Sequence, residues 1–179
     1  MKNKGFTIIE LLVMVGVLAV MSSILFIDFG KDNKKFALER STQKLAQDIR
    51  RSQQMAKSAL SGTVNTTGYG VYLSKAGGSN TQYIVYRNEN VNPYYEAGTD
   101  IIVETTSLEA GISICDIKDN NVSESDNTMS ISFEPPDPIS YIEGNYFGHE
   151  AEITVCVASD ASQLKKILIN NSGRIEISN

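Results

Sequence analysis

Residues 4–27 read KGFTIIELLVMVGVLAVMSSILFI, and this stretch decides the fold. Between Phe6 and Ile27 the chain is almost wholly apolar, and Glu10 is the only charged residue. At about 1.5 Å per residue, a helix over residues 6–27 is roughly 33 Å long, which is enough to cross a bilayer. Lys2 and Lys4 precede the apolar run and favour a cytoplasmic N-terminus. The sequence therefore predicts a transmembrane helix over residues 6–27, with the rest of the chain outside.

The helical pattern continues beyond Asp28 in a different form. Charged side chains become frequent, and apolar or small residues recur every three or four positions: Leu38, Thr42, Leu45, Ile49, Ser52, Ala56 and Leu60. This spacing predicts an amphipathic helix with one apolar stripe. Residues 6–61 contain no proline, and Gly62 is a suitable stop signal. We therefore expect one long helix with an apolar half, 6–27, and an amphipathic half, 28–61.

Residues 62–179 have the composition of a β domain. Short runs rich in Val, Ile, Thr and Tyr are separated by clusters of Gly, Asn, Asp and Pro. The predicted strands are 69–73, 83–87, 100–105, 111–117, 129–133, 152–158, 166–169 and 174–177. No long helical pattern separates them, so antiparallel pairing is expected. The predicted class is α+β, with the long N-terminal helix packed on an antiparallel β domain of about eight strands.

Composition argues against several kinds of site. The 179 residues carry a net charge of −5, and loss of residues 1–5 would remove Lys2 and Lys4 and leave −7. An acidic chain is a poor ligand for nucleic-acid phosphates. The single His149 and the two cysteines do not form a zinc-site pattern. No nucleophile–base or paired-carboxylate motif emerges either. We expect no catalytic residues, no metal and no cofactor.

Cys115 and Cys156 leave two alternatives open. A domain outside the cytoplasm permits a disulfide between them. Two buried free cysteines are the other interpretation, because an unpaired cysteine behaves as a small apolar side chain.

A basic start followed by an apolar run also occurs in secretory signal peptides. Three features argue against that interpretation. The apolar run begins directly after Gly5, and Glu10 lies inside it. The helical pattern also continues where a signal peptide should end in small residues, and residues 20–23 match a cleavage site poorly.

Glu10 needs a physical explanation. A charge in the centre of a membrane helix costs about 2.5–3.5 kcal/mol on insertion scales, and such residues usually have a partner. Cleavage after Gly5 would create an α-amine on Phe6, one turn from Glu10, that could reach the Glu10 of a neighbouring subunit. The pair would offset two costly charges and set the axial register of an assembly. The alternative is an unpaired, protonated Glu10 near the membrane edge.

The segment Lys4-Gly5-Phe6-Thr7-Ile8-Ile9-Glu10-Leu11-Leu12-Val13 resembles the class III signal of type IV prepilins and pseudopilins. The resemblance implies a pilin fold, cleavage between Gly5 and Phe6 by a prepilin peptidase, N-methylation of Phe6 and a role of Glu10 in subunit assembly. It also implies storage as a single-pass protein of the cytoplasmic (inner) membrane. A membrane assembly platform would then move the subunit into a pilus or pseudopilus beside other pilin or pseudopilin subunits.

The later sequence resembles the GspH/FimT group of minor pilins and pseudopilins. The resemblance lies in residues 45–56, in Ile131-Ser132-Phe133-Glu134-Pro135 and in the last strand pair, 165–175. It implies a minor subunit of a type IV pilus or of a type II protein-secretion pseudopilus, and not an enzyme.

The alternative function is that of a competence pilus subunit that binds DNA for uptake. Some members of the group bind DNA through a C-terminal Gly-Arg-x-Arg. Here the stretch is Gly173-Arg174-Ile175-Glu176, with an acid in place of the second arginine. Glu176 and the acidic net charge therefore disfavour DNA as a partner.

Four other segments have open interpretations. The acidic stretch 116–126 is either a solvated loop or a Ca²⁺ loop, although it lacks the EF-hand spacing. The proline-rich stretch 134–139 predicts a stiff loop. Residues 141–147 are aromatic and suit either a contact surface or a loop that covers a sheet edge. His149 is expected in an exposed loop.

Overall fold

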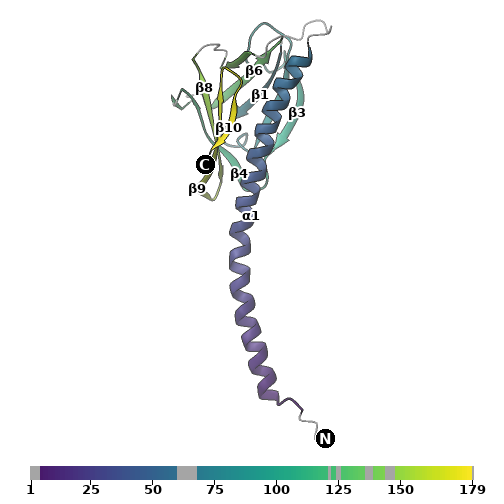
Figure 1. The fold of residues 1–179 in the computed structure, drawn as a ribbon, viewed down its shortest axis with the longest axis vertical. Coiled ribbons are helices and arrows are strands. Elements are labelled where there is room, and N and C mark those ends of the chain that lie inside the picture. Colours follow the sequence, from purple (N-terminus) through teal and green to yellow (C-terminus); the bar gives the residue numbers. More distant parts are fainter. Residues whose placement is uncertain are drawn as a thin grey trace.

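The structure is a computed structural model that describes residues 5–59, 68–120, 122–123, 126–135, 139–143 and 148–178. One helix, α1 (Ile8–Ser58), runs the length of the molecule, and a β domain packs against its C-terminal part (Figure 1). The side chains of α1 are described in two stretches, 8–23 and 33–58. The strands are β1 (Gly68–Ser74), β2 (Gln82–Asn88), β3 (Ile101–Ser107), β4 (Ile112–Asp119), β5 (Val122–Ser123), β6 (Thr128–Glu134), β7 (Ile139–Ile142), β8 (Glu150–Val157), β9 (Asp160–Asn170) and β10 (Ile175–Ser178).

The strands form two five-stranded sheets. Their orders are β3-β2-β1-β6-β7 in sheet A and β10-β9-β8-β4-β5 in sheet B. Every strand pair in the described part of the chain is antiparallel. Hairpin connections explain most of the order, because sequential strands such as β1–β2 and β8–β9 are neighbours. The one long crossover in each sheet brings β6 beside β1 and β8 beside β4.

The core lies between the two sheets and the second stretch of α1. The helix contacts β1 and β6 of sheet A and β4, β8, β9 and β10 of sheet B. The predicted stripe is buried, apart from Leu60, which lies outside the described residues: Leu38, Thr42, Leu45, Ile49, Ser52 and Ala56. Alternate residues of the strands supply the rest of the core, such as Ile153 and Val155 of β8. One amphipathic helix therefore closes both sheets at once.

The expected fold is wrong in its arrangement, although the class remains α+β. The sequence predicted a long helix packed on a single β domain of about eight strands. The described residues instead form ten strands in two sheets, and among the described side chains of α1 the buried ones all lie from Ala37 onward. The missed strands are β5, which has two residues, and β7, which follows the proline-rich stretch. Such short segments carry too little period-2 pattern to be recognised.

The outer face of sheet A is closed by the loop between β2 and β3. Tyr95 of this loop packs its ring 4.8 Å from that of Tyr72 and 5.2 Å from that of Tyr86, measured between centroids. The Tyr86 ring lies directly over Gly70, where an added Cβ would come within 2.6 Å of it. The same Cβ would also lie 2.7 Å from the Ile131 carbonyl oxygen of β6, so Gly70 is required by the close approach of a ring and of a neighbouring backbone.

Candidate assembly site at the N-terminal helix

The candidate site begins where α1 begins. Gly5 and Phe6 precede the helix, and both are exposed. A Cβ added at Gly5 would meet no heavy atom within 4 Å. The packing of the chain itself therefore does not require glycine at this position. Residues 1–4 of the predicted leader lie outside the described residues.

Thr7 and Glu10 form a capping box at the start of α1. The Thr7 hydroxyl accepts from the Glu10 backbone N–H at 3.3 Å. In return, Glu10 Oε2 accepts from the Thr7 backbone N–H at 3.2 Å and from the Thr7 hydroxyl at 3.1 Å. Two backbone N–H groups that the helix cannot satisfy are thus bonded. Glu10 also lies in the first turn, where its negative charge interacts favourably with the helix dipole.

Sequence reasoning missed the role of Thr7, although the Thr-x-x-Glu spacing of a capping box was present in the sequence. The prediction concerned a bond between Glu10 and the α-amine that cleavage would create on Phe6. In the uncleaved chain the Glu10 carboxylate is bonded to Thr7 instead. The two arrangements use the same carboxylate, so Glu10 has one role in capping and a second, still predicted, role after cleavage.

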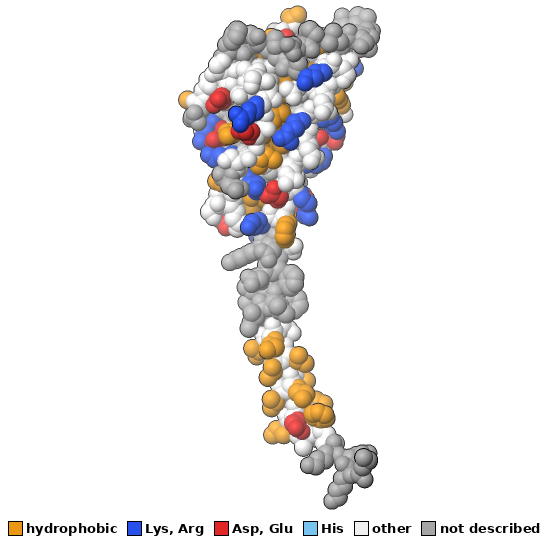
Figure 2. All heavy atoms as spheres, in the orientation of Figure 1, with side chains coloured by type: hydrophobic (Ala, Val, Ile, Leu, Met, Phe, Trp, Pro, Cys, Tyr) orange, Lys and Arg blue, Asp and Glu red, His pale blue; other side chains and the backbone are white. Residues whose placement is uncertain are grey.

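The first stretch of α1 exposes apolar side chains all round. Its large apolar residues from Ile8 to Met21 are 51–87% exposed. In Figure 2 this part of the helix is covered by hydrophobic side chains, with one acidic group near its start. Glu10 is the only charged residue in that stretch. A surface of this kind has to be covered in the functional state, because monomeric proteins rarely expose so large an apolar area.

Among the described residues, no helical segment combines the length and the hydropathy that crossing a membrane requires. The side chains of residues 24–27, the last part of the predicted span, lie outside those described.

The second stretch of α1 is fixed by polar contacts that sequence reasoning missed. Asp48 is buried, and its Oδ2 accepts from the Tyr83 hydroxyl of β2 at 2.6 Å. Arg51 Nη2 lies 2.5 Å from Glu104 Oε2 of β3, and Arg40 makes two 2.7 Å hydrogen bonds to Glu109. Nothing in the sequence links residues so far apart. These contacts set the position of the helix along the domain.

The structure joins Cys115 and Cys156 in a disulfide between β4 and β8. Their Cα atoms are 5.9 Å apart, within the range that a disulfide needs. The register of the two strands shifts between Ile114 and Asp116, so Cys115 is the extra residue of a β-bulge. The bond lies in the β domain and takes no part in the capped helix start.

The remaining predicted residues lie elsewhere in the β domain. Arg174, just before β10, donates to Glu176 of β10, and this ion pair partly offsets the positive charge that would bind a DNA phosphate. His149 is not a simple exposed loop residue, because its Nδ1 lies 2.5 Å from Asp119 Oδ2 and its side chain is only 26% exposed.

The described parts of the acidic stretch 116–126 contain no group of three metal-ligating side chains, and Asp116 is bonded to Lys75. Residues 121 and 124–125 of this stretch lie outside the described residues, as do residues 136–138 and 144–147 of the other two predicted loops.

Comparison with known proteins found no matching family model, no matching curated protein and no matching solved structure.

Proposed function

We propose that this chain is a structural subunit of a helical filament, stored in the cytoplasmic membrane before assembly. One observation carries the proposal. Directly after Gly5 and Phe6, a capped helix begins whose first stretch is apolar and exposed on all sides, and Glu10 is its only charge. An exposed apolar rod of this kind suits burial first in lipid and later among the same rods of other subunits.

The particular class we propose is a type IV pilin-like protein of the GspH/FimT group, that is, a minor pilin or pseudopilin. Prepilin peptidase would cleave between Gly5 and Phe6, and Phe6 would then be N-methylated. The partners would be other subunits and the membrane assembly platform of a type IV pilus or a type II secretion system. The exposed position of Gly5 and Phe6 supports this proposal, because a peptidase needs access to the bond that it cleaves.

The competence-type alternative has less support. The chain is acidic, and the Arg174 guanidinium is already bonded to Glu176. DNA is therefore not among the partners that we propose.

Replacement of Glu10 by Gln tests the assembly role most sharply. Glutamine keeps the size of the side chain and the capping geometry but removes the charge. We expect Glu10→Gln and Glu10→Val to lower the filament-bound fraction by at least about tenfold, because a pair worth more than 1.4 kcal/mol is lost. The measurement is the amount of subunit in sheared, purified filaments relative to that in membranes.

Thr7→Val is the matched control, because it removes the cap but keeps the charge. It should assemble almost as well as the parent chain. Mass spectrometry of membrane-bound Glu10→Gln should still show loss of residues 1–5, since the cut site is intact. Normal assembly of Glu10→Gln would contradict the proposed charge pair, and a mature chain that retains residues 1–5 would contradict the proposed class.

A further inference from the structure

We propose that Lys34, Lys35 and Phe36 seat the base of the β domain on the outer phospholipid headgroup layer of the membrane that stores this chain. The inference rests on the proposed function and deepens it, because it names a second surface of the stored subunit that contacts lipid. The three residues lie on α1 where the helix leaves the β domain, and we call them the basal segment.

Phe36 is the aromatic residue of the basal segment. Its side chain is 62% exposed, whereas the next two residues, Ala37 and Leu38, are buried. Phe36 lies two residues before Leu38 of the buried stripe, which is about 200° around the helix. The ring therefore points away from the two sheets, and packing of the β domain on α1 leaves it exposed.

The length of α1 places Phe36 at the surface of the membrane. From Ile8, where α1 begins, to Phe36 the helix rises about 42 Å, and a bilayer with both headgroup layers is about 40–45 Å thick. With the helix start at the cytoplasmic face, Phe36 comes to the outer headgroup layer. A tilt of about 20°, the average for membrane helices, shortens the rise only to about 40 Å. Side chains of a helix also lean toward its N-terminus, which brings the ring closer to the lipid.

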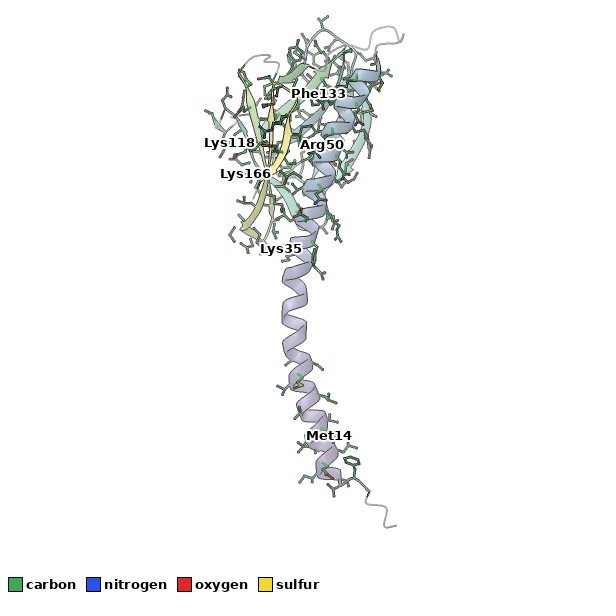
Figure 3. The ribbon with its side chains drawn as sticks, viewed as in Figure 1. Met14, Lys35, Arg50, Lys118, Phe133 and Lys166 are labelled. Carbon is green, nitrogen blue, oxygen red and sulfur yellow. A yellow bond between two sulfur atoms is a disulfide. The ribbon has the colours of Figure 1, made fainter. Side chains whose placement is uncertain are left out.

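Lys34 and Lys35 place positive charge beside this ring. Both side chains are exposed. Lys34 Nζ donates to Ser159 Oγ at 3.0 Å, and this neutral partner leaves the ammonium charged. Figure 3 shows Lys35 where α1 leaves the β domain. Lysines next to an aromatic ring are typical of the membrane interface, where the ammonium groups contact lipid phosphates and the ring lies among the headgroups.

The acidic residues at this end of the domain do not cancel the two lysines. The two glutamates are each paired with a cation of the chain, Glu39 with Lys165 and Glu109 with Arg40. Asp160, in the β8–β9 turn, is the remaining acid at the base among the described residues. The two lysines outnumber it, so the base attracts phosphate groups and anionic lipids.

This seat has a consequence for assembly. A subunit that is drawn out of the membrane has to give up the headgroup contacts of the basal segment as well as the lipid around its apolar stem. The basal segment therefore holds the β domain against the membrane until the subunit is extracted.

A fluorescent reporter in the full-length chain tests the seat. The chain contains no tryptophan, so Phe36→Trp gives a protein with a single one. The protein is inserted into vesicles of phosphatidylcholine and phosphatidylglycerol at a low ratio of protein to lipid, so that neighbouring copies are rare. Lipids that carry a nitroxide quencher, either on the headgroup or at the end of the acyl chain, then report depth. We expect the Phe36→Trp fluorescence to be quenched more strongly by the headgroup label than by the acyl-chain label.

Two other single-tryptophan variants are the controls for depth. Leu18→Trp lies in the apolar stretch of α1, where the side chain is 63% exposed, and should be quenched by the acyl-chain label. Val122→Trp should be quenched by neither label. Val122 is 69% exposed, but it pairs with Asp119 at the end of β4 that lies away from the base.

The lysines are tested by Lys34→Gln/Lys35→Gln in the Phe36→Trp chain. A lysine near an anionic membrane surface contributes a factor of about five to binding, so the ratio of seated to unseated domains should fall about 25-fold. Headgroup quenching should fall with it. Lys57→Gln, which removes an exposed lysine at the other end of α1, is the matched control and should leave the quenching unchanged. Equal quenching in the two lysine variants would overturn the part given to Lys34 and Lys35.

The outcomes separate the seat from the proposed function. Acyl-chain quenching of Leu18→Trp without headgroup quenching of Phe36→Trp overturns the seat and leaves membrane storage standing. A Phe36→Trp residue that is shielded from acrylamide in the water phase but not quenched by lipid is covered by protein, which also overturns the seat. Headgroup quenching of Phe36→Trp without quenching of Leu18→Trp supports the lipid contact and counts against a stem in the membrane. Absence of quenching in both variants overturns both proposals.

Discussion

At the residue scale, Asp48 is the buried acid that joins α1 to sheet A. Its carboxylate accepts from the Tyr83 hydroxyl and lies 3.6 Å from both Lys44 and Arg51. Burial, and then the hydrogen bond to Asp48, raises the pKa of Tyr83 well above its usual value, so the hydroxyl remains a donor. A buried carboxylate is tolerated here because it is both hydrogen-bonded and close to two cations.

Tyr83→Phe removes one hydroxyl and leaves the Asp48 carboxylate without that donor. We expect the free energy of unfolding to fall by about 1–3 kcal/mol, the usual cost of an unsatisfied buried polar group. Denaturant unfolding of the full chain in detergent, followed by circular dichroism, measures the change. Tyr94→Phe, in the exposed β2–β3 loop, should change stability by less than about 0.5 kcal/mol. Equal effects of the two variants would contradict the role given to Asp48.

At the element scale, β4 and β8 are joined both by their hydrogen-bond ladder and by a covalent bond. The Cys115–Cys156 disulfide closes a segment with a sequence separation of 41, and it does so at the bulge of β4. Cys156 is buried at 2% exposure, and Cys115 is exposed. The bond therefore holds the centre of sheet B at the position where the ladder is irregular.

Loss of this disulfide should destabilise the β domain without changing its fold. The double variant Cys115→Ala/Cys156→Ala is expected to lose about 2–4 kcal/mol, since the unfolded chain gains conformational freedom. Thermal unfolding under non-reducing conditions provides the measurement. Reducing agent should lower the melting temperature of the parent chain by about as much as the double substitution does, and it should leave the melting temperature of the double variant unchanged. A change in the melting temperature of the double variant would exclude the disulfide as the cause.

At the scale of the whole molecule, three of the ion pairs between α1 and the β domain in the described residues each lower the pKa of a glutamate. They are Glu39–Lys165, Arg51–Glu104 and Arg40–Glu109. In each pair the hydrogen bond from the cation is the main cause that lowers the pKa of the glutamate. All three are partly exposed, so salt should weaken them. Together they link the helix to both sheets.

These lowered pKa values predict an acid-sensitive domain. A carboxylate whose folded-state pKa is depressed contributes stability above its unfolded pKa and loses it as pH falls through the folded value. The melting temperature of the full chain should therefore decline below about pH 5. The triple variant Glu39→Gln/Glu104→Gln/Glu109→Gln should show a flatter profile in that window. An unchanged slope in the triple variant would assign the acid sensitivity to other groups.

Local pattern was sufficient for part of this architecture. The three- and four-residue spacing from Leu38 to Ala56 predicted which helix face is buried. This is possible because an amphipathic helix buries its apolar face in the core regardless of which strands it packs against. Eight of the strand positions could also be recognised, since a half-buried strand alternates within a few residues. The cut-site sequence and Glu10 supplied the candidate site. Cleavage after Gly5 and the pairing of Glu10 between subunits remain predictions, because both involve other molecules.

The sequence by itself therefore determined the α+β class, the apolar helix start and the buried stripe, all of which depend on neighbouring residues. Tertiary structure alone decided the division into two sheets, the Asp48–Tyr83 bond, the Cys115–Cys156 pairing and the Arg51–Glu104 ion pair. Each of these depends on residues that are far apart in the chain and meet only after folding. The physical reason is that periodicity reports which face is buried, whereas a partner is fixed by long-range packing, which no local pattern encodes.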